Sequence, residues 1–402
     1  MDNKEKIWII TELFSPDQTS TAYVLTHIAN YLADSYEVEV ICGPLNHLQK
    51  IDFNGSANNS NMKVTRIRSL NLNKNNLITR SIRLIMISIQ LSIKYLSIAK
   101  KSEKVLIVTN PAPLLLIFAL ISTFSNRKII LLIHDVFPEN AIAANIISNQ
   151  KSFLYRTLKK IYDFAYSQFY ILIVLGRDMK LVVSKKIEQG KKKAKIKTIE
   201  NWADIINIYP LKIDDIALRM WNVQNKIVFL FAGNLGRTQA LEELLLIIKR
   251  TKNPLLHFVF AGEGALKERL IKFVKINSLE NVTIGNSFSR SEQCEILNSC
   301  HVGLVTLAKG MAGLGVPSKS YNMLAAGKPI LFFGDENSEI SLLVKENNIG
   351  WSHSSSDSLL EFFNQIDESY FKISKVLGQN SRIVAETKYS ESVILRKFKE
   401  IL

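Results

Sequence analysis

The segment at 313–319, Gly-Leu-Gly-Val-Pro-Ser-Lys, joins two glycines to residues that favour the start of a helix. Pro317 suits the first helical turn, and Gly327 suits the helix end. The free N–H groups at a helix start attract anions because the helix dipole is positive there. Ser318 adds a hydroxyl group and Lys319 adds a full positive charge. These features predict a phosphate site at Pro317, Ser318 and Lys319, although a capped packing helix would share them.

Two further turns in the second half of the chain could contact a ligand. Residues 231–240 (Phe-Ala-Gly-Asn-Leu-Gly-Arg-Thr-Gln-Ala) connect a predicted strand to a predicted helix, and Arg237 could donate paired hydrogen bonds to a phosphate. Gly262, Glu263 and Gly264 form half of a Gly-x-Gly-x-x-Gly pattern. Because the third glycine is missing, an ordinary strand-to-helix turn is the simpler interpretation of this last segment.

His134 and Asp135 end an apolar run in the first half of the chain. A polar pair at the carboxyl end of a buried strand points toward a cleft, and histidine can act as a base or a hydrogen-bond donor near neutral pH. A strand-end turn would explain the pair equally well. The other five histidines show no metal-ligand spacing and no Asp-x-Asp pair occurs, so we predict no bound metal.

The elements that must hold these residues are alternating strands and helices. Short runs rich in Ile and Val, mostly without alternation, predict parallel strands that are buried on both faces. In the first half they lie at 7–11, 37–43, 105–110, 128–135 and 169–176, with helices such as 21–33 and 153–167 between them. In the second half they lie at 226–234, 255–264, 281–285, 302–307 and 329–334, with helices at 240–250, 265–277, 292–299 and 317–326.

This pattern predicts an α/β protein with two doubly wound, Rossmann-like domains that share a ligand cleft. We expect an N-terminal domain at 1–205 and a C-terminal domain at 206–385, divided near the mixed polar stretch around Pro210. A basic amphipathic helix within 386–402 could pack back on the first domain.

Composition narrows the class of protein. With 402 residues, 47% of them hydrophobic and 22% charged, the chain has enough apolar material for two packed cores and is not disordered. Three cysteines without a Cys-x-x-Cys pair exclude a disulfide scaffold, and no secretory leader is visible, so we expect a cytoplasmic protein. Residues 1–200 hold 28 basic and 15 acidic residues, whereas 201–402 hold 23 and 21. A basic half could face nucleic acid, anionic lipid or a phosphorylated substrate.

Residues 76–101 favour the lipid alternative. The stretch at 84–93 is almost wholly apolar and is flanked by Arg80, Arg83 and Lys94. It is too short to span a bilayer, but a basic helix with an apolar face can lie in a membrane surface. An ordinary helix buried on the sheet remains the alternative. No basic motif interleaved with aromatic residues occurs, which argues against nucleic-acid binding.

Taken in order, these motifs resemble retaining glycosyltransferases of the GT-B fold, family 4, of the bacterial O-antigen and capsule type, and are similar to N-acetyl-L-fucosamine transferases. The resemblance covers nearly the whole chain. It rests on Phe14-Ser15-Pro16-Asp17 with Thr21, His134-Asp135 with Pro138, Val174 to Met179, Asn201-Trp202-Ala203-Asp204, Gly233-Asn234-Leu235-Gly236 with Gln239, and Pro317-Ser318-Lys319 with Ala325 to Pro329.

The resemblance implies a role for each matched position. The C-terminal domain would hold a UDP-sugar, with its diphosphate contacted by Gly233, Asn234, Gly236, Arg237, Pro317, Ser318 and Lys319. Glu263 and Gly264 would line the nucleoside side. His134 and Asp135 would face the sugar and the acceptor hydroxyl. No cofactor besides the UDP-sugar donor is implied.

The chain departs from the family pattern at two glutamates that are separated by seven residues. The first, which contacts the sugar in the family, is Leu314 here; the second, which holds the ribose hydroxyls, is Asn322. Asn322 can still hydrogen-bond but carries no charge, and Arg237 with Lys319 could replace the family's usual cation pair.

The expected function is therefore transfer of a sugar, an N-acetylhexosamine by resemblance, from a UDP-sugar to a lipid-linked (polyprenyl-diphosphate) glycan in surface polysaccharide synthesis. The enzyme would be peripheral on the cytoplasmic face of the inner membrane. Two alternatives stay open: a UDP-sugar 2-epimerase, which needs neither acceptor nor membrane, and an inactive nucleotide-sugar-binding scaffold.

Overall fold

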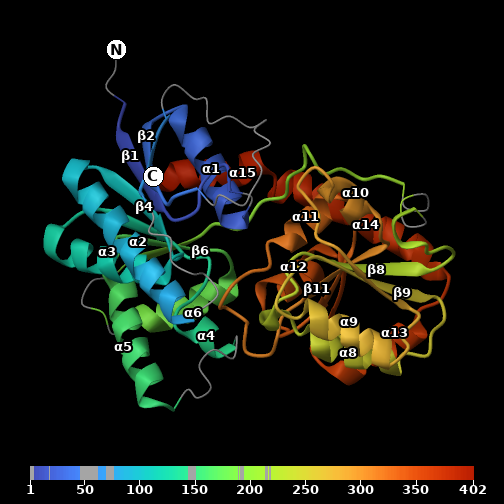
Figure 1. Cartoon of the computed structure of the whole chain (residues 1–402). Coiled ribbons are helices and arrows are strands. Elements are labelled where there is room, and N and C mark those ends of the chain that lie inside the picture. Colours follow the sequence, from blue (N-terminus) through green and yellow to red (C-terminus); the bar gives the residue numbers. More distant parts are fainter. Residues whose placement is uncertain are drawn as a thin grey trace.

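Two parallel β-sheets, each covered by helices, form the two lobes of the molecule (Figure 1). The computed structural model describes residues 4–17, 19–45, 62–68, 77–143, 151–188, 190, 194–212, 216 and 219–402. The first lobe runs from blue to green in the figure and the second from yellow to red. This arrangement confirms the expected GT-B architecture of two Rossmann-like domains.

The N-terminal sheet has seven strands, and its first strand lies near the middle. Ile7 of β1 lies opposite Val38 of β2 on one side and opposite Lys104 of β4 on the other. All central strands are buried, as their Ile and Val content requires. The order is β3 (Met62–Arg66), β2 (Glu37–Cys42), β1 (Lys6–Thr11), β4 (Lys104–Val108), β5 (Ile129–Leu132), β6 (Ile171–Val174) and β7 (Lys195–Thr198).

The C-terminal sheet repeats this plan with six strands. Its core is dominated by phenylalanines, among which Phe229, Phe258 and Phe363 pack ring against ring. The order is β10 (Val282–Gly285), β9 (Leu256–Ala261), β8 (Ile227–Ala232), β11 (Val302–Thr306), β12 (Ile330–Phe333) and β13 (Gly350–His353).

All ten strands predicted from the sequence are present, but three others were missed: β3, β7 and β13. Each of the three lies at an edge of its sheet, where one side of the strand has no neighbour. Such strands are partly exposed and therefore carry polar residues, as Lys195 and Lys197 do in β7. A search for continuous apolar runs cannot find them.

The helices connect these strands and cover the sheets. The described helices of the first lobe are α1 (Ser20–Ala33), α2 (Leu77–Ile98), α3 (Ala112–Ser125), α4 (Glu139–Ala143), α5 (Phe153–Ser167) and α6 (Arg177–Ile187). Those of the second are η1 (Arg237–Gln239), α8 (Leu241–Arg250), α9 (Lys267–Ile276), α10 (Gln293–Asn298), α11 (Lys319–Ala325), α12 (Glu339–Asn347), α13 (Ser356–Gln365) and α14 (Ser369–Lys388). The last helix, α15 (Glu391–Ile401), lies beside α1 in the first lobe (Figure 1). The domain boundary expected at 205/206 stays a prediction.

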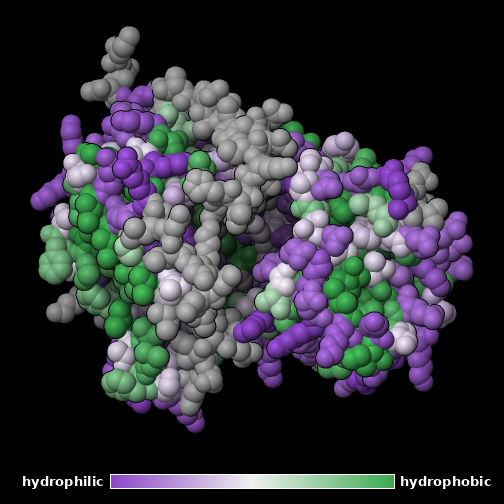
Figure 2. Space-filling model, viewed as in Figure 1, coloured by the Kyte–Doolittle hydropathy of each residue, from purple (hydrophilic) through white to green (hydrophobic). Residues whose placement is uncertain are grey.

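The outer face of the first lobe is unusually apolar. Helix α2 buries Ile87, Leu91 and Tyr95 against the domain core, yet Ile89 and Ile93 on its other side are exposed. In Figure 2, a band of hydrophobic (green) surface on the first lobe follows α2. The helix is longer than the apolar run at 84–93, and its segment Thr79–Ile98 meets the length and hydropathy of a membrane span. Because one face is packed on the sheet, α2 is a helix of this domain with a second apolar face turned outward.

The two lobes are joined by an exchange of helix caps. Asp178, in the first turn of α6, accepts hydrogen bonds from the backbone N–H of Glu339 (3.1 Å) and of Gly313 (3.0 Å) in the second lobe. Glu339, at the start of α12, accepts in return from the backbone N–H of Arg177 (2.6 Å) and from its guanidinium. Each helix start therefore has one of its free N–H groups satisfied by a carboxylate of the other lobe.

Candidate functional site

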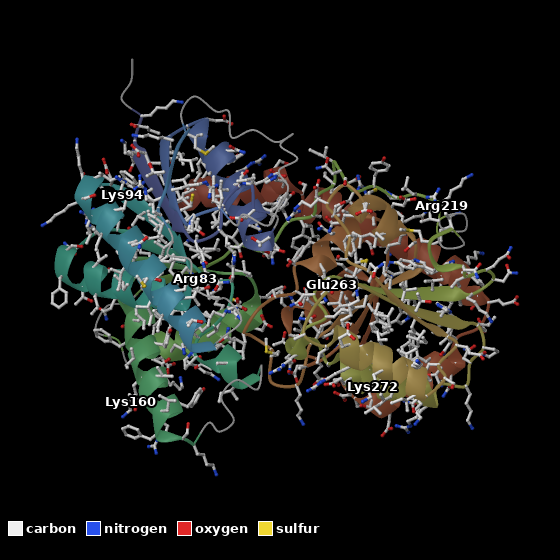
Figure 3. The ribbon with its side chains drawn as sticks, viewed as in Figure 1. Arg83, Lys94, Lys160, Arg219, Glu263 and Lys272 are labelled. Atoms are coloured by element: carbon white, nitrogen blue, oxygen red, sulfur yellow. The ribbon has the colours of Figure 1, made fainter. Side chains whose placement is uncertain are left out.

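A cavity of about 490 Å³ lies between the lobes and is lined by residues of both. The first lobe contributes Ser20, Tyr23 and Val24 of α1, together with Asn201 and Trp202 beyond β7. Seven of the predicted site residues line it from the second lobe: Gly233, Asn234, Glu263, Pro317, Ser318, Lys319 and Asn322. Figure 3 shows Glu263 on the side of the second lobe that faces the first. Residues that lie far apart in the sequence thus meet in one cleft.

The turns at the ends of β8 and β9 each contain a glycine, which allows the two backbones to pack closely against each other. Gly233 and Gly262 have φ angles of 132° and 150°, which side chains disfavour. A Cβ atom on Gly262 would lie 1.8 Å from the carbonyl oxygen of Gly233, so only glycine allows these turns to pack together. The pair brings Asn234 and Glu263 to the same wall of the cleft.

Lys319 is a cationic residue of this wall. Its Nζ donates to Oε1 of Gln239 (2.9 Å) and lies 3.3 Å from the ring centroid of Phe231. Burial lowers the pKa of Lys319 well below its usual range. No carboxylate among the described residues pairs with it. A desolvated ammonium without a counter-charge, at the start of α11, is suited to an anionic ligand.

Three predicted residues of this domain lie outside the cleft lining. Arg237 is in η1, and its side chain is exposed with no partner in the described part of the chain. Gly236 precedes η1 directly. At Gly264 an added Cβ would lie 2.5 Å from the carbonyl oxygen of Leu235, so this glycine serves the packing of the turn.

His134 and Asp135 lie at the end of β5 and not in the lining of the cleft cavity. Their backbone N–H groups both donate to Oγ1 of Thr109, at the end of β4 (3.1 and 3.3 Å). Burial lowers the pKa of His134 to about 4 and raises that of Asp135 to about 6. Near neutral pH the imidazole is therefore neutral and the carboxylate is mostly ionised.

The glycine loop of the second lobe lies against this pair. The backbone N–H of Val136 donates to the carbonyl of Leu314 (2.9 Å), and an added Cβ on Gly315 would lie 3.5 Å from Oδ1 of Asp135. Nε2 of His134 is shielded from water and has no hydrogen-bond partner among the described residues. The pair and the loop thus form a second contact between the two lobes, beside the cleft.

Sequence reasoning missed Tyr23 and Arg290, which meet across the cleft. The guanidinium carbon of Arg290 lies 3.9 Å from the ring centroid of Tyr23, and the Tyr23 hydroxyl donates to Oδ2 of Asp204 (3.3 Å). Arg290 follows the carboxyl end of β10, where ligand-binding loops of parallel sheets are found. That rule could have identified Arg290, whereas Tyr23 becomes visible only when both lobes are present.

Asn322 and Asn201 supply uncharged polar groups to the cleft. Oδ1 of Asn322 accepts from the backbone N–H of Asp204 (3.3 Å), which links α11 to the segment between the lobes. Nδ2 of Asn201 is buried without a partner among the described residues, so one donor is left for a ligand. In the described ranges no group of three or more His, Cys, Asp or Glu side chains is arranged to hold a metal ion.

The chain is similar to known proteins along its whole length. It is 33% identical over 397 residues to WbjE of Pseudomonas aeruginosa, named as a probable glycosyltransferase, covering 98% of this chain and 96% of that protein. It is 26% identical over 167 residues, 40% of each chain, to WcaI of Escherichia coli, which is named for colanic acid biosynthesis. No protein-family model matches the chain.

Solved structures share the fold at low identity. A sucrose-phosphate synthase of Thermosynechococcus elongatus superposes with a TM-score of 0.78 at 11% identity, covering 99% of this chain and 98% of that one. HepE of Anabaena, solved in complex with UDP, superposes with a TM-score of 0.69 at 15% identity and covers 99% of each chain. At these identities the likeness is one of fold.

Proposed function

The chain belongs to the glycosyltransferases of GT-B fold, and from that premise we propose that it moves a sugar from a UDP-sugar to a lipid-linked glycan. The observation that carries the donor half is Lys319, a cation held in the cleft with Gln239 as its hydrogen-bond partner and no counter-charge in the described chain. A diphosphate would supply that charge. The HepE complexes with UDP and UDP-glucose support uridine as the nucleoside of the donor.

The proposed chemistry is a retaining transfer. Lys319 and the N–H groups around Ser318 would stabilise the departing diphosphate, because preorganised positive groups in a water-poor site are effective there. The leaving phosphate would take the proton of the acceptor hydroxyl on the same face of the sugar. His134 and Asp135 would then orient the sugar and the acceptor. An N-acetylhexosamine is the proposed sugar, on the family resemblance alone.

The acceptor half of the proposal rests on the outer face of the first lobe. Phe124 on α3 and Phe153 on α5 are each 85% exposed, and Ile89, Ile93 and Leu120 are exposed on α2 and α3. Basic residues accompany this apolar surface, including Lys94 and Lys160, which Figure 3 shows on the outer side of the lobe. An apolar surface with a basic rim suits the cytoplasmic face of an inner membrane, where a polyprenyl-diphosphate glycan would be held. The name of WcaI, which refers to colanic acid, supports a polysaccharide product.

Calorimetric titration with UDP, GDP, ADP and CMP tests the donor half. We expect UDP to bind and Lys319→Ala to lose that binding, whereas Lys272→Ala, on the outside of the second lobe (Figure 3), should bind as the parent does. No binding of any nucleotide would favour the inactive scaffold. Conversion of a UDP-sugar without an acceptor would favour the 2-epimerase.

Sedimentation with vesicles tests the acceptor half. The full chain should bind vesicles that contain phosphatidylglycerol more tightly than vesicles of phosphatidylcholine alone. Phe124→Ser combined with Phe153→Ser should weaken this binding about 30-fold or more, since each of the two aromatic rings stabilises the bound state by about 1 kcal/mol or more. Leu246→Ser, an exposed apolar position on α8 of the other lobe, is the matched control. Equal binding by all three proteins would contradict the proposal.

A further inference from the structure

A second cavity, of about 870 Å³, lies in the C-terminal lobe and shares no lining residue with the cleft. Its walls are the connecting segment at 210–212, the residues that follow α11 at 326–328, and the part of α14 between Phe371 and Ile383. The volume is in the range of small-molecule sites, about 300–1,000 Å³. Nothing in the proposed transfer of a sugar uses this cavity.

Lys328 is the unusual residue of this second cavity. It is only 3% exposed, and in the described structure its ammonium group makes no ion pair and no hydrogen bond. Lys186, which is 4% exposed, shows how this chain otherwise treats a buried lysine: its Nζ contacts Glu139 (2.7 Å) and Asp163 (2.6 Å). Burying an unpaired charge is costly, and burial accordingly lowers the pKa of Lys328 to about 8.

Other cations line the same cavity as Lys328, and none of the described lining residues is acidic. Lys212 and Lys375 line the cavity with exposed side chains that have no partner in the described part of the chain. Arg382 is already satisfied, because it donates to Glu386 and to the carbonyls of Ile205, Ile208 and Ala325. Three ammonium groups of this cavity therefore have no carboxylate partner among the residues that the structure describes.

The remaining wall is aromatic and apolar. The rings of His301 and Phe371 pack edge to face with centroids 5.1 Å apart. Nδ1 of His301 accepts from the backbone N–H of Val228 (3.1 Å), so the neutral ring carries its hydrogen on Nε2. This wall could hold the uncharged part of a ligand whose anionic part meets the lysines.

We propose that this cavity binds a small phosphorylated anion through Lys328, Lys212 and Lys375. A phosphate group presents several acceptor oxygens and more than one negative charge, which matches three donors without carboxylates. Lys328 forms the inner contact, and the two exposed lysines form the outer ones. The site lies behind the cleft, since α11 begins at Lys319 in the cleft and ends just before Lys328.

Calorimetry with inorganic pyrophosphate as the probe tests this site, on full-length chain that carries Lys319→Ala so that the cleft cannot compete. At pH 7 we expect binding that Lys328→Met weakens about tenfold or more, because a charge-assisted contact is lost. Lys328→Arg should keep the binding. Lys375→Met should weaken it less, since that side chain is exposed.

The number of protons taken up on binding distinguishes a lysine that contacts the ligand from one that has only a structural role. The titratable and charged groups around Lys328 are Cys294, Cys300, His301, Lys212, Lys375 and Arg382. At pH 8 the unbound ammonium is partly deprotonated, so binding should take up protons, and affinity should fall as pH rises further. Lys328→Arg should abolish the proton uptake.

Pyrophosphate binding that is lost in Lys328→Met and is linked to proton uptake supports the proposal. Equal binding by the parent and Lys328→Met overturns it, as does the absence of binding to the Lys319→Ala parent. Because UDP binding in the cleft is measured separately, failure here leaves the proposed transferase reaction untouched.

Discussion

The two walls of the cleft region differ in the groups that burial leaves without a partner: one holds an ammonium group with no carboxylate beside it in the described chain, and the other holds a histidine and an aspartate. On the C-terminal side, burial lowers the pKa of Lys319, and no carboxylate in the described chain compensates it. On the N-terminal side, burial moves His134 and Asp135 toward their neutral forms, with pKa values of about 4 and 6, and Thr109 holds both backbones. One wall therefore lacks a negative charge, whereas the other lacks only a hydrogen-bond partner for Nε2 of His134 among the described residues. On this difference we propose that the first wall stabilises charge and the second orients the substrates.

The largest effect should follow removal of the cation from the C-terminal wall. Lys319→Met should lower turnover by about 100- to 1,000-fold, because a preorganised charge at the leaving group is lost. The assay is sugar transfer from radiolabelled UDP-sugar to membrane lipid. The matched control is Lys272→Met on the outside of the same lobe. If Lys319→Met keeps turnover within about threefold of the control, the two walls do not differ as proposed.

The second prediction concerns the hydrogen bonds that join the two lobes. Asp178 is 7% exposed and accepts from Gly313 and Glu339 of the other lobe. Asp178→Asn should remove about 2 kcal/mol of stability, because Oδ2 accepts from Gly313 and Glu339 while Oδ1 accepts from the N–H of Met179, and an amide turns one of these two oxygens into a donor. Turnover should fall about tenfold, since the glycine loop that starts at Gly313 would shift relative to Asp135.

Thermal unfolding and turnover check this prediction, with Asp357→Asn as the control. Asp357 is exposed and pairs with Arg250 at 3.5 Å, so its replacement should change neither quantity. A variant of Asp178 with unchanged stability and unchanged turnover would mean that the exchanged helix caps do not position the cleft.

The contrast between local and distant contacts also explains what could be predicted from the sequence. Pro317, Ser318 and Lys319 were identified because a helix start and its charge are neighbours in sequence. The central strands were found because burial on both faces leaves an apolar run. The caps between α6 and α12 could not be predicted, since Asp178 and Glu339 are 161 residues apart. The contact of Arg290 with Tyr23 needs two folded lobes for the same reason.

The third prediction uses pH to test the N-terminal wall. Asp135 is ionised above its pKa of about 6, and the proposed orienting role requires its carboxylate to accept a hydrogen bond from a hydroxyl of the bound sugar or acceptor other than the reacting one. The value of kcat/KM should therefore fall about tenfold per pH unit below 6. Asp135→Asn should flatten this limb. An unchanged acid limb in the variant would exclude Asp135 as its source.

The stability of the same variant should move in the opposite direction. Because the folded-state pKa of Asp135 is raised, ionising it costs stability as pH rises from about 4 to about 6. Asp135→Asn should therefore be more stable than the parent at pH 8, and this advantage should disappear near pH 4. Thermal unfolding at both pH values measures the difference and separates a folding effect from a catalytic one.

The smallest effect should come from Arg237. Replacing it tests whether a positive charge must be buried in the cleft to support turnover, or whether an exposed charge beside the cleft serves as well. Arg237 is exposed on η1 and lies outside the cleft lining, so water and salt screen its charge. Arg237→Ala should lower turnover only about threefold, and less at high ionic strength, whereas the loss in Lys319→Met should persist in salt. A loss as large as that of Lys319→Met would mean that η1 closes onto the diphosphate during the reaction, and the wall would then contain two essential cations instead of one.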